Sequence, residues 1–189
     1  FILNGDDDKL STVKTVNGKK PVFFGLDAKN DFYAKNIKNS GDGKVLATLC
    51  FDNNNIDVEI PAIGTYMVTN ALAAAAAGKL LGLTDEEIAN GVASYKTVGS
   101  RANVINTGKI KIIDDCYNAN PTSVRASLDT LSNLDGRKVA ILGDMKELGS
   151  EELKLHFDTG VYAKSKDIGT VITVGELAKE LAKGADGKA

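Results

Sequence analysis

Polar side chains gather at the end of one short apolar run, "KIKII", at residues 109–113. Asp114 and Asp115 follow this run directly, and an amide-rich turn with Asn118 and Asn120 comes before a proline. In an open α/β sheet, ligands bind beyond the carboxyl ends of the strands, where a carboxylate can accept the hydroxyls of a ribose. Successive side chains of a strand point to opposite faces, so only one of the two acids would serve. The pattern favours Asp115 as a candidate nucleotide-binding residue.

Two further apolar runs end in the same way. "KVAIL" at residues 138–142 and "TVITV" at residues 170–174 are each followed by a glycine and an acid. The polar or flexible residues after these two runs are Gly143, Asp144, Lys146, Glu147, Gly175 and Glu176. Because the carboxyl ends of parallel strands meet at one edge of a sheet, the three runs together indicate a binding edge better than any one residue does.

Some of these residues have a purely structural interpretation. Asn is a favoured helix N-cap and Pro a favoured first helical residue, so Asn120 before Pro121 predicts a helix start. Ser150, followed by two glutamates, predicts another capped start. A cap does not require the neighbouring acids and amides, so both interpretations of Asn120 remain open.

Histidine and cysteine are too few for a zinc site or a disulfide framework, and no metal site is predicted in the chain. The single histidine, His156, lies in a helical stretch where a packed or solvated side chain is the commoner case. Cys50 and Cys116 lie in or beside apolar runs, which predicts buried or half-buried reduced thiols and suits the cytoplasm.

The sequence lacks the two familiar phosphate-binding loops. Gly-Lys occurs at 18, 43, 78, 108 and 187, but Ser or Thr never follows, and there is no G-x-G-x-x-G pattern. If the protein uses a nucleoside triphosphate, the loop that holds its phosphates lies outside these 189 residues.

The elements that must position these residues fall into two halves. Residues 1–60 alternate short apolar runs with Gly, Asn and Asp clusters, which predicts strands in a meander or hairpins. Residues 65–94 are rich in Ala and carry a capping box at Thr84 and Glu87, which predicts two helices. After a connector at 96–106, strand and helix patterns alternate three times, as in a parallel α/β sheet. We expect the domain boundary near Gly99.

The composition limits the kinds of partner that this protein is expected to bind. A net charge of −2 without basic runs argues against nucleic acid and membrane surfaces, and no apolar stretch is long enough to span a bilayer. The chain begins inside an apolar run without Met and stops after a helical pattern, so we expect a fragment that lacks material at both ends.

Taken together, "IDDCYNANPTSVRASLDTL", "GRKVAILGDMKELG" and "IGTYMVTNALAAAAAGKLLG" closely resemble the Mur ligases. The resemblance implies a two-domain α/β chain. Residues 1–98 would be the latter part of a central ATPase domain, with strands and then helices. Residues 99–189 would be a Rossmann-like C-terminal domain with a mostly parallel sheet, truncated at its end.

The resemblance also implies an activity. The parent enzyme would be an ATP-dependent amide ligase that joins D-Ala-D-Ala to a UDP-N-acetylmuramoyl-tripeptide through an acyl phosphate, in peptidoglycan precursor synthesis. Its cofactors would be ATP and Mg²⁺, with the metal ligands and the phosphate loop upstream of Phe1. No residue of this fragment is expected to be catalytic, and the fragment is expected to be inactive alone. The alternatives are a folate-type ligase of the same architecture and a non-catalytic α/β binding module.

The positions of the matching motifs assign the implied roles to single residues. Asn70 would contact the adenine, Arg101 the phosphates and Asp115 the ribose, and Asn118 and Asn120 would line the same loop. The dipeptide would lie near Asp144, Lys146 and Glu147. The chain departs from the family at Tyr66-Met67, where the family has His-Asn, and this changes the hydrogen bonding expected near the adenine.

Overall fold

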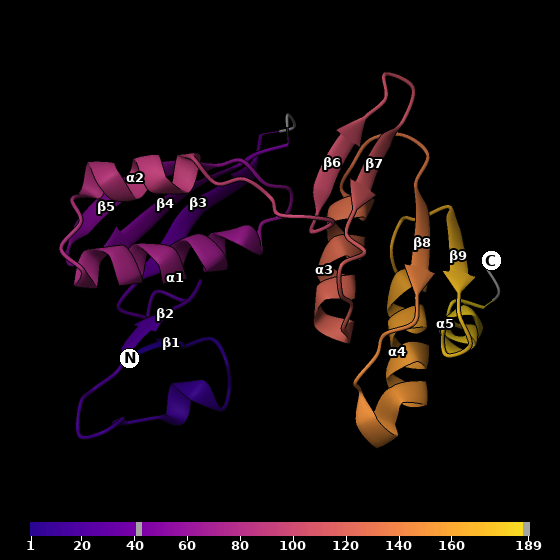
Figure 1. Cartoon of the computed structure of the whole chain (residues 1–189), viewed down its shortest axis with the longest axis horizontal. Coiled ribbons are helices and arrows are strands. Elements are labelled where there is room, and N and C mark those ends of the chain that lie inside the picture. Colours follow the sequence, from indigo (N-terminus) through magenta and orange to yellow (C-terminus); the bar gives the residue numbers. More distant parts are fainter. Residues whose placement is uncertain (41–42, 187–189) are drawn as a thin grey trace. The chain divides into compact units, whose positions relative to one another are not determined.

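The chain folds into two compact units, Phe1–Thr97 and Val98–Ala189 (Figure 1). A computed structural model describes residues 1–40 and 43–186. Each unit has a hydrophobic core of its own.

The first unit is built on an antiparallel meander. Its strands are β1 (Ile2–Asn4), β2 (Val22–Phe24), β3 (Tyr33–Asn39), β4 (Val45–Phe51) and β5 (Asn54–Ile60), with a short 3-10 helix η1 (Leu10–Thr12) after β1. β3, β4 and β5 form one antiparallel sheet, while β1 pairs with β2 in parallel. The β4–β5 turn is made by Asp52 and Asn53, which both have positive φ, as a two-residue hairpin turn requires. The predicted meander is confirmed for β3–β5, whereas the parallel pairing of β1 with β2 departs from it.

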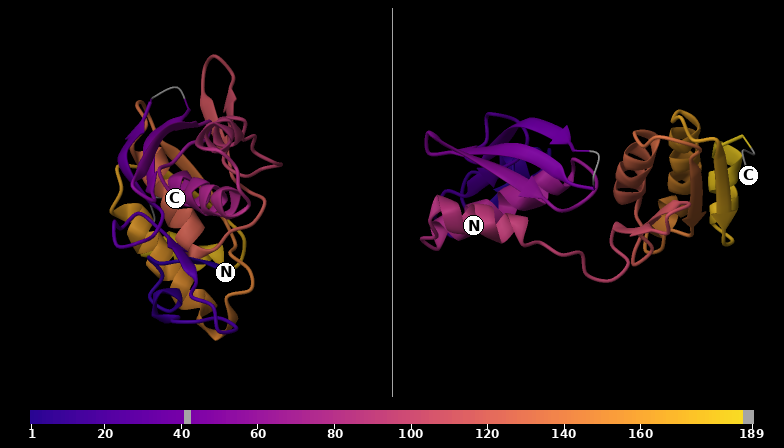
Figure 2. Two further views of the ribbon diagram at one scale, coloured as in Figure 1. Left: turned by 90° about the vertical axis from the view of Figure 1, so that its left-hand side faces the viewer. Right: turned by 90° about the horizontal axis from the view of Figure 1, so that it is seen from above.

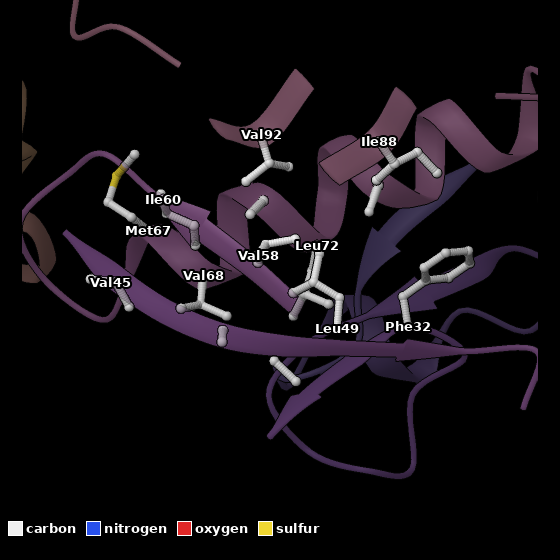
Figure 3. Close-up of a cluster of buried hydrophobic side chains, with 14 of the residues drawn as sticks. Phe32, Val45, Leu49, Val58, Ile60, Met67, Val68, Leu72, Ile88 and Val92 are labelled. Carbon is white, nitrogen blue, oxygen red and sulfur yellow. The ribbon is translucent and has the colours of Figure 1, made fainter. Parts of the chain in front are cut away.

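Two helices cover one face of this sheet (Figures 1 and 2). They are α1 (Met67–Leu80) and α2 (Asp85–Ala93), and Thr84 caps α2 through the capping box predicted with Glu87. Leu49 and Leu72 are completely buried between sheet and helix, and Ile88 and Val92 of α2 point into the same cluster (Figure 3). Each fully buried side chain of this kind contributes about 1.5–3 kcal/mol to the free energy of folding.

The second unit alternates strands and helices. Its elements are β6 (Asn103–Asn106), β7 (Lys111–Asp114), α3 (Pro121–Ser132), β8 (Val139–Gly143), the 3-10 helix η2 (Gly149–Glu151), α4 (Glu152–Lys164), β9 (Thr170–Val174) and α5 (Ala178–Gly184). β8 and β9 pair in parallel, with Ala140 opposite Val171, and α4 connects them. Leu128 of α3 and Leu181 of α5 meet these strands in the core.

The sheet differs in part from the sequence-based expectation. The sequence pattern places residues 103–106 in the connector, but they form β6, which pairs with β7 in an antiparallel hairpin. Within residues 98–186, the parallel pairing is therefore that of β8 with β9, and β6–β7 and β8–β9 form separate two-stranded sheets. The hairpin is closed locally: Thr107 and Ile110 bond each other across the turn, and the side chain of Asn106 accepts from the amide of Gly108. Strand periodicity does not reveal such a turn.

Two further expectations need correction. Ser150 does not cap a helix: it lies inside η2, and neither η2 nor α4 has a side-chain cap. Cys116 is exposed, because the chain has already left β7 at that point, whereas Cys50 is buried in β4 as expected. Both cysteines are free thiols.

Candidate functional site

Asp115 joins three segments of the second unit. One carboxylate oxygen accepts a hydrogen bond from the backbone N–H of Ala102 at 2.9 Å, and the other accepts from the hydroxyl of Ser127 on α3 at 2.6 Å. Ala102 is buried and has a positive φ, so this bond fixes a tight bend just before β6. Asp115 is half-buried at the carboxyl end of β7.

Asp114 has a different set of partners, as strand alternation predicts. Its carboxylate accepts a hydrogen bond from the Cys116 thiol at 3.1 Å. This bond, followed by one from Ser100, lowers the pKa of Asp114 below its ordinary value. Asp114 therefore stays ionised beside the loop without occupying the position of Asp115.

Arg101 lies against the loop that follows β7. Its guanidinium carbon is 4.1 Å from the centre of the Tyr117 ring, and the amide of Tyr117 donates to the carbonyl of Ser100 at 3.0 Å. Such cation–π contacts favour a fixed guanidinium position. Tyr117 was not among the predicted site residues, although an aromatic residue between an acid and two amides was a usable signal.

The two asparagines of the loop differ in their role. Asn120 caps α3: its side-chain oxygen accepts from the Ser123 amide at 2.9 Å, and the Ser123 hydroxyl accepts from the Asn120 amide at 3.1 Å. The cap predicted from Asn120 and Pro121 is confirmed. Asn118 is exposed, and its oxygen accepts from the amide of the next residue, Ala119. Its NH₂ group has no protein acceptor within the described ranges 1–40 and 43–186.

Asn70 belongs to the first unit, whereas the other predicted site residues belong to the second. It is exposed on α1, and its amide donates to the sulfur of Met67 at 3.5 Å. Met67 is buried in the core of the first unit.

Asp144 links the ends of β8 and β9. One oxygen accepts from the amide of Ala178, at the start of α5, at 2.8 Å, and the other pairs with Lys146 at 3.0 Å. Both contacts lower the pKa of the Asp144 carboxyl below its ordinary value, and the contact with Lys146 has the larger effect. Gly175 has a positive φ, and a Cβ there would overlap the Asp144 carboxylate. The predicted convergence of strand ends is therefore present for β8 and β9.

Lys146 and Glu147 are both exposed beyond Asp144. Glu147 adopts a left-handed φ of 62°, and within the described part of the chain its carboxylate makes no hydrogen bond or ion pair. The backbone here presents two neighbouring opposite charges.

The described residues offer no group of three or more His, Cys, Asp or Glu side chains that could hold a metal ion. Across the same part of the chain, every helix is too short or too polar to cross a membrane.

Family models account for most of the chain. The Mur ligase middle domain matches residues 1–78, and the Mur ligase glutamate ligase domain matches residues 100–189. The chain belongs to the Mur ligase family, as the motifs indicated, and the expected α/β class is confirmed.

Individual relatives are more specific. The UDP-N-acetylmuramoyl-tripeptide–D-alanyl-D-alanine ligase of Bacillus subtilis is 33% identical over 188 residues, which are 98% of this chain and 40% of that protein. A crystal structure of MurF from Acinetobacter baumannii matches with a TM-score of 0.83 at 31% identity, over 89% of this chain and 36% of that one. MurF from Thermotoga maritima, in complex with ADP, matches with a TM-score of 0.82 at 25% identity, over 95% of this chain and 41% of that one. The chain thus spans about 40% of the length of the Bacillus relative.

Proposed function

We propose that this chain is the latter part of an ATP-dependent ligase that adds D-Ala-D-Ala to a UDP-N-acetylmuramoyl-tripeptide. Residues 1–98 would be the end of the central ATP-binding domain and residues 99–189 the C-terminal domain. The relative from B. subtilis, at 33% identity, is named for this reaction. Free thiols at Cys50 and Cys116 suit a reducing compartment, and we infer a cytoplasmic location.

The reaction has two steps. The tripeptide carboxylate attacks the γ-phosphorus of ATP, which forms an acyl phosphate and releases ADP. The amine of D-Ala-D-Ala then attacks the acyl carbon, an amide bond forms, the carbon–oxygen bond to phosphate breaks, and the amine loses a proton. Both steps depend on holding the reactants close and in line.

The observation that carries the proposal is the gathering of Arg101 and Asp115 at the carboxyl end of β7. The guanidinium is held over Tyr117, and Asp115 fixes the bend beside it. In this proposal Arg101 contacts the phosphates, Asp115 the ribose and Asn70 the adenine. Asn118, with its NH₂ group available, lines the same loop, whereas the side-chain oxygen of Asn120 is already used by the cap.

The dipeptide side is the loop after β8. The Asp144 carboxylate is occupied by Ala178 and Lys146, so its role there is to support the loop. Glu147 is the carboxylate that remains available for the ammonium group of the dipeptide, and Lys146 is the cation nearest to it in sequence.

Magnesium is expected with ATP, and the described residues offer no group of three or more His, Cys, Asp or Glu side chains that could serve as its ligands. We expect these ligands upstream of Phe1, and no step here is assigned to the metal.

A phosphate-release assay on the full-length protein tests the proposal. With ATP and the UDP-linked tripeptide present, phosphate should be released when D-Ala-D-Ala is added, and much less when it is replaced by glutamate. Glutamate-dependent release with a folate substrate would instead indicate a folate-type ligase, and no acceptor-dependent release would contradict a ligase.

A further inference from the structure

His156 is fully buried, and both of its ring nitrogens have partners. Nδ1 lies 2.7 Å from the carbonyl oxygen of Glu152, and Nε2 lies 2.9 Å from the backbone nitrogen of Met145. An amide N–H can only donate, so Nε2 must accept and Nδ1 must carry the proton that goes to Glu152. The bonding therefore fixes one neutral tautomer.

The histidine holds the loop that follows β8, residues 144–148, from the side of α4. Met145 is completely buried, while Lys146 and Glu147 next to it are exposed. The residue before it, Asp144, is bound to the first turn of α5 through Ala178. The loop is thus attached to two helices at successive residues, and Glu147 completes the turn with its positive φ.

This attachment determines where the two exposed charges lie. If the Met145 amide lost its acceptor, its buried N–H would be unpaired. The loop, which holds Glu147 in a left-handed conformation, would then change conformation readily. A dipeptide substrate carries one ammonium and one carboxylate group, which match Glu147 and Lys146 in charge. A reacting amine must be placed accurately, because a displacement of about 1 Å can lower the rate about a hundredfold.

We propose that His156 is a positioning residue, which fixes the 144–148 loop through the Met145 amide so that Lys146 and Glu147 can bind a zwitterionic dipeptide. This inference rests on the proposed function, since it assigns the incoming amine to this loop. It does not make His156 a catalytic residue, because a fully buried ring does not reach the substrate.

Two substitutions of similar polarity distinguish the roles of the two ring nitrogens of His156. His156→Gln keeps an acceptor near the position of Nε2, whereas the shorter side chain of His156→Asn reaches only the position of Nδ1. The control is Thr159→Val, because Thr159 is equally buried on α4 but its hydroxyl donates to the carbonyl of Leu155 within the same helix. The readouts in the full-length protein are the KM for D-Ala-D-Ala, the KM for ATP, and the hydrogen-exchange rate of the Met145 amide.

We expect His156→Asn to raise the KM for D-Ala-D-Ala by about ten- to a hundredfold and to speed exchange of the Met145 amide, with the KM for ATP within about twofold of wild type. His156→Gln and Thr159→Val should stay close to wild type in both constants. An unchanged dipeptide KM in folded His156→Asn, or an equal rise in both KM values, would overturn the inference. A wild-type protein without D-Ala-D-Ala-dependent turnover would overturn the proposed function instead. In that case, unchanged Met145 exchange in His156→Asn would also show that His156 does not hold the loop.

Discussion

Asp115 supports the fold of the second unit through its hydrogen bonds, and its contact with the nucleotide is a proposal. Its two oxygens bond Ala102 and Ser127 within the second unit, yet a carboxylate has lone pairs for further donors. Because Ala102 is buried, loss of the carboxylate leaves its N–H without a partner. A substitution at Asp115 therefore changes stability as well as any contact with the nucleotide.

Separate substitutions of Asp115 and of its partner Ser127 distinguish the effect on stability from the effect on nucleotide binding. Asp115→Ala should lower the free energy of unfolding by about 1–3 kcal/mol and weaken ATP binding by the full-length protein. Ser127→Ala removes one hydrogen bond, costs about 0.5–1.5 kcal/mol, and should leave ATP affinity unchanged because the carboxylate remains. Urea unfolding and titration calorimetry measure the two quantities. ATP affinity that is equal in Asp115→Ala and wild type would argue against the ribose contact.

At the scale of elements, α4 and α5 cross at two glycines. A Cβ at Gly160 would overlap the carbonyl oxygen of Leu181, and a Cβ at Gly184 would overlap that of Phe157. The backbones can approach this closely only without side chains at the crossing. The same pair of helices supports the 144–148 loop, through His156 on α4 and Ala178 on α5.

Gly160→Ala should therefore destabilise the second unit, by about 1–3 kcal/mol, because neither backbone can yield without a shift of the helix. Gly91→Ala in α2 is the matched control: a Cβ there meets open space, and alanine should stabilise the helix by about 0.5–1 kcal/mol. Thermal unfolding of the 189-residue chain compares the two. Equal shifts of Tm in the same direction would show that the close crossing does not determine the effect.

At the scale of the whole molecule, the candidate nucleotide residues are divided between the units. Asn70 belongs to the first and Arg101 and Asp115 to the second. No Gly-Lys pair of the 189 residues is followed by Ser or Thr, so a phosphate loop of the Walker type is not part of the sequence. The chain also spans only 40% of its Bacillus relative.

The isolated 189-residue chain should accordingly release no phosphate from ATP above the buffer blank, because its sequence has no phosphate loop of the Walker type. A sensitive phosphate assay at millimolar ATP and Mg²⁺ measures this. The control is the same preparation of Asp115→Ala. Turnover by the pure wild-type chain that Asp115→Ala abolishes would show that the fragment is active and the expectation wrong.

Local chemistry made several features predictable from the sequence. The capping box at Thr84, the N-cap at Asn120, the meander of β3–β5 and the order of strands and helices after residue 109 follow from side-chain periodicity and cap preferences. Motif spacing led to the family, which the family models confirm. The roles of Asn70, Arg101 and the other site residues remain predictions.

Tertiary structure decided what depends on contacts distant in sequence. Residues 103–106 became a strand because β7 lies opposite them, and Asp144 became the support of α5 because Ala178, 34 residues later, folds back to it. His156 gained its function as a loop anchor in the same way, since only the packing of α4 against the end of β8 brings its Nε2 to the Met145 amide. The sequence by itself determined the local elements and the family, because those depend on neighbours along the chain. The partners of each polar group were decided by the fold, because a buried group bonds whatever the packing brings within about 3 Å.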